Sequence, residues 1–279
     1  FRKGDFILGN DVTKFDPNVK IIDYAVQSED RPLMNLVGKE FVEELSTNSP
    51  APGGGSVSAL AGALGAALSS MVASLSHEKK ELIDLKPEMN EIGIEAQNLK
   101  DHLSFLVDED TNAFNKVMDA NRLPATNDEE KSAKNEAIEI ANKYAIEIPL
   151  ETAKKCFRVI ELADILVEKG NPNSVSDAGV AAEVALAGVS GACMNVLINL
   201  SGVDNQVYCD EKRSAMDKLI QKAEAKQNAP QREKSSIFER VLASKIDPKS
   251  NAERSLFCNA MEITREPSQR NEAQRLESV

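Results

Sequence analysis

Acidic side chains inside an apolar helical pattern are the clearest candidates for chemistry in this sequence. Asp108 and Asp110 lie in the segment 105–114, where apolar residues recur at helical spacing. Apolar neighbours and a second nearby acid both raise the pKa of a carboxyl group, which suits a general acid at neutral pH. An acidic run is also typical of a solvent-exposed helix face. Both interpretations stay open on the residues alone.

A turn rich in proline and glycine precedes a long uncharged segment. The turn contains Pro50, Pro52, Gly53, Gly54, Gly55 and Ser56. The prolines hold the backbone extended, and the glycines remove every side chain just before a predicted helix. Backbone N–H groups at such a helix start can hold an anion or a flat polar ligand. The alternative is a tight turn that only lets two helices pack closely.

Further polar residues lie at the ends of uncharged helical segments. Asn195 and Asn199 are four residues apart, so they share one face of a helix and need partners there, either other helices or a ligand. Asp177 precedes the same helix, where N-capping is an alternative role. Lys79 and Lys80 could neutralise acidic groups of a ligand, or simply form a solvated helix end.

Several classes of function are disfavoured by composition and motifs. The two histidines, His77 and His102, have no neighbour at a metal-ligand spacing, so neither a metal site nor histidine-based nucleophilic catalysis is expected. The four cysteines are scattered, which predicts reduced thiols and a cytoplasmic location. The net charge of −12, without a basic tract, disfavours nucleic acid as a partner. Glycine motifs for dinucleotides or for a P-loop do not occur.

Hydrophobic periodicity predicts an all-α fold, an antiparallel up-and-down bundle of long helices. The expected helices are 35–46, 56–76, 86–120, 127–169, a neutral helix after the break at 170–174, and 205–227. Thr126 or Asn127 is expected to cap the fourth helix, and Pro149 to bend it.

Two uncharged stretches, between Glu44 and Glu78 and between Glu183 and Asp204, approach the length of a membrane span. Their content of Gly, Ala and Ser, and the cost of placing asparagine in lipid, favour buried helices of a soluble bundle without a membrane partner.

Three parts of the chain are distinguished by composition. Residues 35–227 form the predicted helical domain. Residues 1–34 are interpreted as a linker or the end of a preceding domain, and the start at Phe1 predicts a fragment of a longer protein. Residues 228–279 form a polar tail, expected to be mostly disordered or to contain one short helix.

These motifs together resemble a known family. The matching segments are Phe41-Val42, the turn at 49–57, 64–68, Met71-Val72, 106–110, Leu123-Pro124, 175–177 and 195–200. In this order and spacing they are similar to the cyclodeaminase/cyclohydrolase domain of formimidoyltransferase-cyclodeaminase, over residues 35–227. Residues 14–24 resemble the end of the formimidoyltransferase domain and its linker.

The resemblance implies an oligomeric helical domain that acts on folate. Family members convert 5-formimidoyltetrahydrofolate to 5,10-methenyltetrahydrofolate and ammonia, in histidine breakdown, with the folate as substrate and no cofactor. Alternatives are a methenyltetrahydrofolate cyclohydrolase, or a non-catalytic domain that channels folate and assembles subunits. Expected partners are a polyglutamylated folate, further copies in a homo-oligomer with the cleft near a subunit contact, and a formimidoyltransferase domain, fused or in trans.

The resemblance also assigns roles to residues. It implies Asp110 as the catalytic acid, with Asp108 as the rival assignment. The remaining expected substrate contacts are Gly53, Gly54, Gly55 and Ser56 for the pterin or a carboxylate, Lys79 and Lys80 for the glutamate tail, and Asp177, Asn195 and Asn199 for the pterin.

Overall fold

The computed structural model describes residues 33–36 and 38–228. Its α-helices are α3 (Gly38–Leu45), α4 (Gly54–Glu78), α5 (Lys86–Arg122), α6 (Asp128–Lys169), α7 (Val175–Leu200) and α8 (Gln206–Asn228), with short 3-10 helices η2 (Lys80–Leu85) and η3 (Pro172–Ser174). The described residues contain no strand, so the all-α prediction is confirmed. The predicted linker and tail lie largely outside the described residues.

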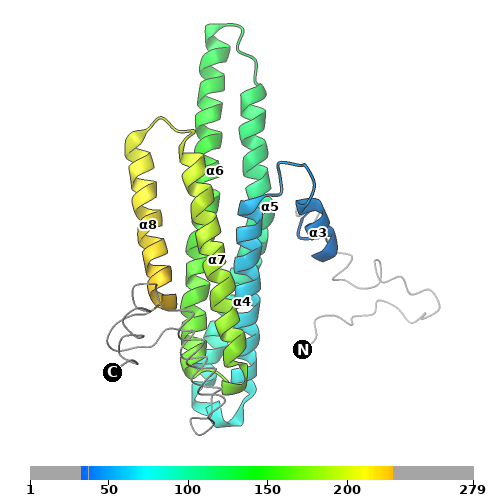
Figure 1. Ribbon diagram of the computed structural model, residues 1–279, viewed down its shortest axis with the longest axis vertical. Coiled ribbons are helices and arrows are strands. Elements are labelled where there is room, and N and C mark those ends of the chain that lie inside the picture. Colours follow the sequence, from blue (N-terminus) through cyan, green and yellow to red (C-terminus); the bar gives the residue numbers. More distant parts are fainter. Residues whose placement is uncertain (1–32, 37, 229–279) are drawn as a thin grey trace, which may run out of the picture.

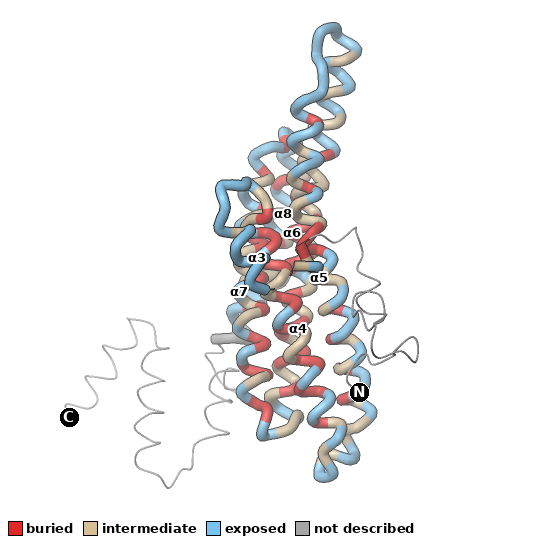
Figure 2. Tube along the Cα trace, turned by 90° about the vertical axis from the view of Figure 1, so that its right-hand side faces the viewer, coloured by how far each residue is buried: buried red, intermediate tan, exposed pale blue. Residues whose placement is uncertain are grey.

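The helices from α4 to α8 alternate in direction, so that consecutive helices lie side by side (Figure 1). Helix α4 packs against α5, α6 and α7, and α8 covers α6 and α7. Because α5 and α6 are much longer than α4 and α7, their connected ends project beyond the bundle. Buried residues gather along the middle of the bundle, whereas the projecting hairpin is mostly exposed (Figure 2).

Local sequence explains where α6 begins and how it continues. Asn127 caps it, with its side-chain oxygen accepting the backbone N–H of Glu130 at 2.8 Å. The Glu130 carboxylate in turn accepts the backbone N–H of Thr126 at 2.8 Å, which completes a reciprocal cap. The cap is therefore Asn127, one of the two predicted residues. Helix α6 runs on through the buried Pro149 to Lys169.

Small residues set the close approach of α4, α6 and α7. A Cβ atom added at Gly62 would lie 2.4 Å from the Cys156 sulfur, and one added at Gly188 would lie 2.8 Å from the same atom. At Gly65 it would lie 2.7 Å from the carbonyl oxygen of Ala181. Separations this short leave no room for a side chain, so the glycines determine how tightly α4 and α7 pack against each other and against α6.

Two helical segments are long and apolar enough, by length and composition alone, to cross a membrane. The segments are Gly54–Glu78 and Pro172–Leu200. In the apolar 18-residue stretch of each, 61% of the first and 44% of the second is buried inside the protein. Burial against α5, α6 and α7 accounts for much of the apolar character of α4, as predicted for a central helix. The outer faces of both helices keep apolar side chains exposed.

Candidate active site

A cavity of about 300 Å³ lies where α4 begins, between α4, α5, α6 and α7. Its lining combines the predicted turn before and at the start of α4 with residues of the three other helices. The turn supplies Pro50, Ala51, Gly53, Gly54 and Gly55, α5 supplies Asp110, Ala113, Phe114 and Val117, α6 supplies Asn142 and Ala145, and α7 supplies Asn195 and Asn199. Asp110 is the one ionisable side chain among these lining residues. The cavity therefore offers a single acid–base group in otherwise uncharged surroundings.

The Asp110 carboxyl group is held against the start of α4. Its Oδ2 atom lies 3.3 Å from the hydroxyl of Ser56, which is buried and donates to the carbonyl of Val107 at 2.8 Å. Burial raises the pKa of Asp110, and the hydrogen bonds from the Ser56 side chain and backbone oppose this rise only in part. The carboxyl can thus hold a proton closer to neutral pH than an exposed aspartate can.

Gly55 is the residue that lets the carboxyl approach the turn. A Cβ atom added there would lie 2.0 Å from Asp110 Oδ1 and 2.4 Å from its Cγ. No side chain fits at that distance, so the glycine is required for the observed position of the acid. The two other glycines are less crowded, since a Cβ at Gly54 would meet Asn195 Nδ2 at 3.5 Å and one at Gly53 would meet Pro50 O at 3.7 Å.

Three asparagine side chains line the cavity, and each donates a hydrogen bond to a backbone carbonyl. Asn142 Nδ2 donates to the carbonyl of Gly202 at 2.6 Å. Asn195 Nδ2 donates to Gly191 at 2.8 Å, and Asn199 Nδ2 donates to Ala145 at 2.7 Å. Because each amide nitrogen is tied to a backbone carbonyl, each side-chain oxygen can serve as an acceptor for N–H groups of a ligand.

The structure thus brings to one cavity six of the residues expected at the site: Gly53, Gly54, Gly55, Asp110, Asn195 and Asn199. Sequence reasoning missed Asn142 and Phe114. Asn142 lies in a polar stretch of α6 without a distinguishing spacing, and Phe114 is one of many apolar residues in the α5 pattern.

Asp108 lies in a different environment from Asp110. It is 3% exposed, and its carboxylate accepts the backbone N–H groups of Leu33 at 2.7 Å and Met34 at 3.3 Å. Asp108 therefore fastens the segment before α3 to α5 and does not line the cavity. Neither acid belongs to a solvated face, which was the alternative interpretation of this run.

Lys79, Lys80 and Asp177 lie at the opposite end of the bundle. Lys79 follows the last residue of α4, whose 25 residues span about 36 Å at the helical rise. Its ammonium group donates to Asn171 Oδ1 at 3.2 Å. Asp177 is in the first turn of α7, whereas Asn195 and Asn199 are near its end. Within one chain these three residues do not join the Asp110 cavity.

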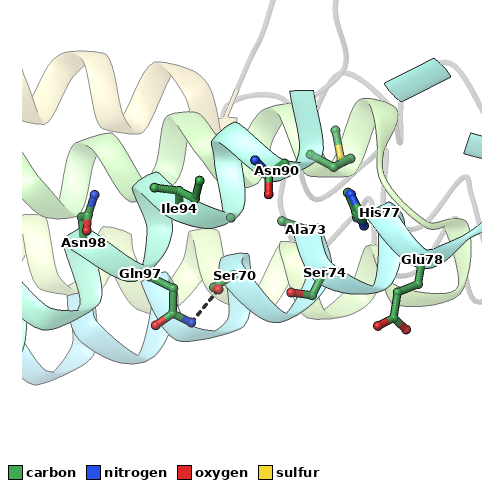
Figure 3. A pocket seen from close by; sticks show the side chains of 11 residues that line it. Ser70, Ala73, Ser74, His77, Glu78, Asn90, Ile94, Gln97 and Asn98 are labelled. Atoms are coloured by element: carbon green, nitrogen blue, oxygen red, sulfur yellow. Dashed lines mark hydrogen bonds between the residues drawn. The ribbon is translucent and has the colours of Figure 1, made fainter. Parts of the chain in front are cut away.

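A second cavity, of about 370 Å³, lies at that opposite end between α4 and α5. Five of its eleven lining residues carry an amide or a hydroxyl group: Ser70, Ser74, Asn90, Gln97 and Asn98 (Figure 3). Gln97 Nε2 donates to Ser70 Oγ at 2.8 Å across it. None of the predicted site residues lines this cavity. The described residues hold no group of three or more His, Cys, Asp or Glu side chains that could bind a metal ion.

The fold and the cavity define a helical-bundle domain whose cavity is lined by one ionisable side chain and by several amide acceptors. The sequence model of the formiminotransferase-cyclodeaminase family matches residues 38–218. The chain belongs to this family of folate-processing cyclodeaminases and cyclohydrolases.

Relatives of this chain are named for each of the two activities, cyclohydrolase and cyclodeaminase. A methenyltetrahydrofolate cyclohydrolase from Methylorubrum extorquens is 38% identical over 185 residues, which cover 66% of this chain and 89% of the relative. The formimidoyltransferase-cyclodeaminase of Rattus norvegicus is 34% identical over 75% of this chain, and the match spans 39% of the rat protein. The crystal structure of formiminotetrahydrofolate cyclodeaminase from Thermotoga maritima matches with a TM-score of 0.58 and 28% identity, covering 68% of this chain and 94% of that one.

Proposed function

We propose that this chain is a formimidoyltetrahydrofolate cyclodeaminase, an ammonia lyase that closes 5-formimidoyltetrahydrofolate to 5,10-methenyltetrahydrofolate. The observation that carries the proposal is the half-buried Asp110 carboxyl with its raised pKa, which faces a cavity lined by no other charged group. A protonated amidine is cationic and carries several N–H donors. A carboxyl group and three amide oxygens form a wall that can accept hydrogen bonds from such a group.

The proposed reaction requires one proton to move within the substrate. The folate N10 attacks the amidinium carbon attached to N5, which forms the second C–N bond of the ring. Asp110 takes the proton that N10 releases and delivers it to the amino group, so that ammonia leaves and the methenyl cation forms with the same net charge. Both reacting groups belong to one molecule, so holding them in geometry supplies much of the rate. Ser56 keeps the carboxyl in place.

A cyclohydrolase is the second candidate, because the Methylorubrum relative is matched over most of its length. In that reaction Asp110, in its ionised form, would take a proton from the water that attacks the methenyl carbon. Both reactions expel a nitrogen that takes up a proton, ammonia in the deaminase and a ring nitrogen in the cyclohydrolase, so the raised pKa of Asp110 suits either one. The support for the deaminase is the similarity to the rat and Thermotoga proteins that are named for that activity.

The assembly and location remain part of the same proposal. We propose a cytoplasmic homo-oligomer that uses polyglutamylated folate and works with a formimidoyltransferase domain. The support for the transferase partner is that the relatives named formimidoyltransferase-cyclodeaminase are much longer than the region that they share with this chain.

The test is a direct comparison of two substrates. The purified chain is incubated with 5-formimidoyltetrahydrofolate, and methenyltetrahydrofolate absorbance and ammonia are followed together. A parallel reaction starts from 5,10-methenyltetrahydrofolate and follows the loss of its absorbance. Equal yields of methenyl product and ammonia above the spontaneous rate support the deaminase. Catalysed loss of the methenyl compound without any ammonia release in the first assay refutes it in favour of the cyclohydrolase.

A further inference from the structure

Helix α6 contains a proline in its interior. Pro149 lies near the middle of this 42-residue helix and is buried. Proline is the least favourable residue at such a position, because it has no backbone N–H and its ring crowds the carbonyl group four residues earlier. Helix formation alone therefore does not account for a proline here.

The carbonyl group four residues before Pro149 belongs to Ala145. In an uninterrupted α-helix its oxygen would accept the backbone N–H of residue 149, and proline has none to donate. The oxygen instead accepts the side-chain amide of Asn199, whose Nδ2 atom lies 2.7 Å away. This contact crosses from α6 to α7, which pack side by side (Figure 1). The missing helical donor thus leaves an acceptor that the neighbouring helix uses.

This hydrogen bond fixes which way the Asn199 amide is turned. A carbonyl oxygen can only accept a hydrogen bond, so the amide nitrogen must face Ala145. The amide oxygen then lies on the other side and is available to a ligand in the cavity, which both Asn199 and Ala145 line. An amide turned the other way would offer N–H donors to the ligand in place of an acceptor.

The other two asparagines of the cavity are held by carbonyl groups that do not depend on the proline. Asn195 donates to Gly191, which lies four residues earlier in the same helix. Asn142 donates to Gly202, which follows the end of α7. Among the three, Asn199 is therefore the one whose amide is held by an interior carbonyl of another helix, and Asn195 offers an internal comparison.

From these contacts we infer that Pro149 is a positioning residue of the candidate site. It withholds the helical donor from Ala145, and the freed carbonyl holds the Asn199 amide with its oxygen toward the cavity. Pro149 is not among the residues that line the cavity, so it acts through Asn199. One part of the inference rests on the proposed function: the Asn199 oxygen accepts a hydrogen bond from an N–H group of the folate substrate.

A double-mutant cycle tests the link between Pro149 and Asn199 without any substrate. Asn199→Ala removes the donor to Ala145, and in the wild-type background residue 149 has no N–H to replace it. In a Pro149→Ala background the new backbone N–H can bond that carbonyl. We therefore expect Asn199→Ala to lower the urea midpoint of the wild type about twice as far, or more, as it lowers that of Pro149→Ala.

Asn195→Ala is the matched control, because the Asn195 amide bonds within α7. It should lower the urea midpoint by the same amount in both backgrounds. Equal shifts for Asn199→Ala in the two backgrounds overturn the inference. Pro149→Val, which keeps more of the buried volume and also supplies an N–H, takes the place of Pro149→Ala if circular dichroism shows that the alanine protein does not fold.

The same variants test the consequence for the site by steady-state kinetics. The substrate is whichever of 5-formimidoyltetrahydrofolate and 5,10-methenyltetrahydrofolate the wild type converts. Pro149→Ala should raise KM about tenfold with little change in kcat, because the lost hydrogen bond is made in both the bound substrate and the transition state. Asn199→Ala should do the same, and the double variant should show about the same tenfold rise, because both changes remove one contact.

The two measurements separate this inference from the proposed function. A rise in KM of about 100-fold in the double variant, as expected for two independent contacts, overturns the role of Pro149 through Asn199, as does an unchanged KM in Pro149→Ala. A wild-type protein that converts neither substrate refutes the proposed function instead, and the urea titrations then decide whether Pro149 frees Ala145 to hold Asn199.

Discussion

Gly55→Ala tests whether the position of the Asp110 carboxyl determines the rate. The new methyl group would lie 2.0 Å from Asp110 Oδ1, 2.4 Å from Cγ and 2.5 Å from Oδ2. Ordinary contact requires about 3.4 Å, so the carboxyl group must move by roughly 1.4 Å or rotate away from Ser56. A displacement of about 1 Å in a catalytic group can cost on the order of 100-fold in rate. We therefore expect kcat to fall by about 100-fold.

The fold should tolerate this change, because the crowded atoms belong to a side chain end and not to the backbone. Gly54→Ala is the matched control in the same turn, since its methyl group would meet its nearest neighbour, Asn195 Nδ2, at an ordinary 3.5 Å. Alanine in a helix is also favoured over glycine by about 0.5–1 kcal/mol, so the control should not be less stable.

The assay is steady-state formation of methenyltetrahydrofolate from 5-formimidoyltetrahydrofolate, with circular dichroism and a thermal midpoint for each protein. The reasoning is refuted if folded Gly55→Ala keeps the wild-type kcat. It is equally refuted if Gly54→Ala loses as much kcat as Gly55→Ala, because the loss would then follow from the turn and not from the acid.

The described contacts lead to three further predictions. Asp110→Asn should lower kcat by about 10²–10⁴-fold without changing the oligomer mass. Burial raises the pKa of Asp110 in the folded state, so ionisation of this group lowers the stability as the pH rises through its folded pKa. The Asp110→Asn protein should therefore melt at a higher temperature than the wild type at pH 7. In a pH series the two melting temperatures should converge below about pH 3.9. Asp108→Asn should instead lower the free energy of unfolding, measured by urea titration, by about 1–3 kcal/mol. The kcat of the folded variant should stay within a few-fold of the wild-type value. A large loss of kcat would favour Asp108 as the catalytic acid. Gly65→Ala, whose methyl group would lie 2.7 Å from a backbone carbonyl, should destabilise the bundle by about 1–3 kcal/mol in the same titration, and an unchanged midpoint would contradict the close approach of α4 and α7.

Much of the fold could be predicted from the sequence because its signals are local. Helical periodicity placed the long helices to within a few residues, and the Thr126–Glu130 segment predicted a cap that the structure contains. The first helix begins later than expected, at Gly38 and not at residue 35, because the residues before it bind Asp108 through their backbone N–H groups. That contact joins positions 75 residues apart, which no local pattern records.

The candidate site, like the fold, could be predicted from the sequence only in part. Residue types and short-range spacing were enough to predict the helices, the uncharged turn of three glycines, and the presence of two acids within an apolar pattern on one helix. The tertiary structure was needed to show that Asp110 lines the cavity whereas Asp108 does not, that Asn142 of α6 joins the lining, and that Lys79 and Asp177 lie away from it. The physical reason is that neighbouring carboxylates differ through the helices packed around them, and that helix length, about 1.5 Å per residue, fixes which ends of the bundle can meet.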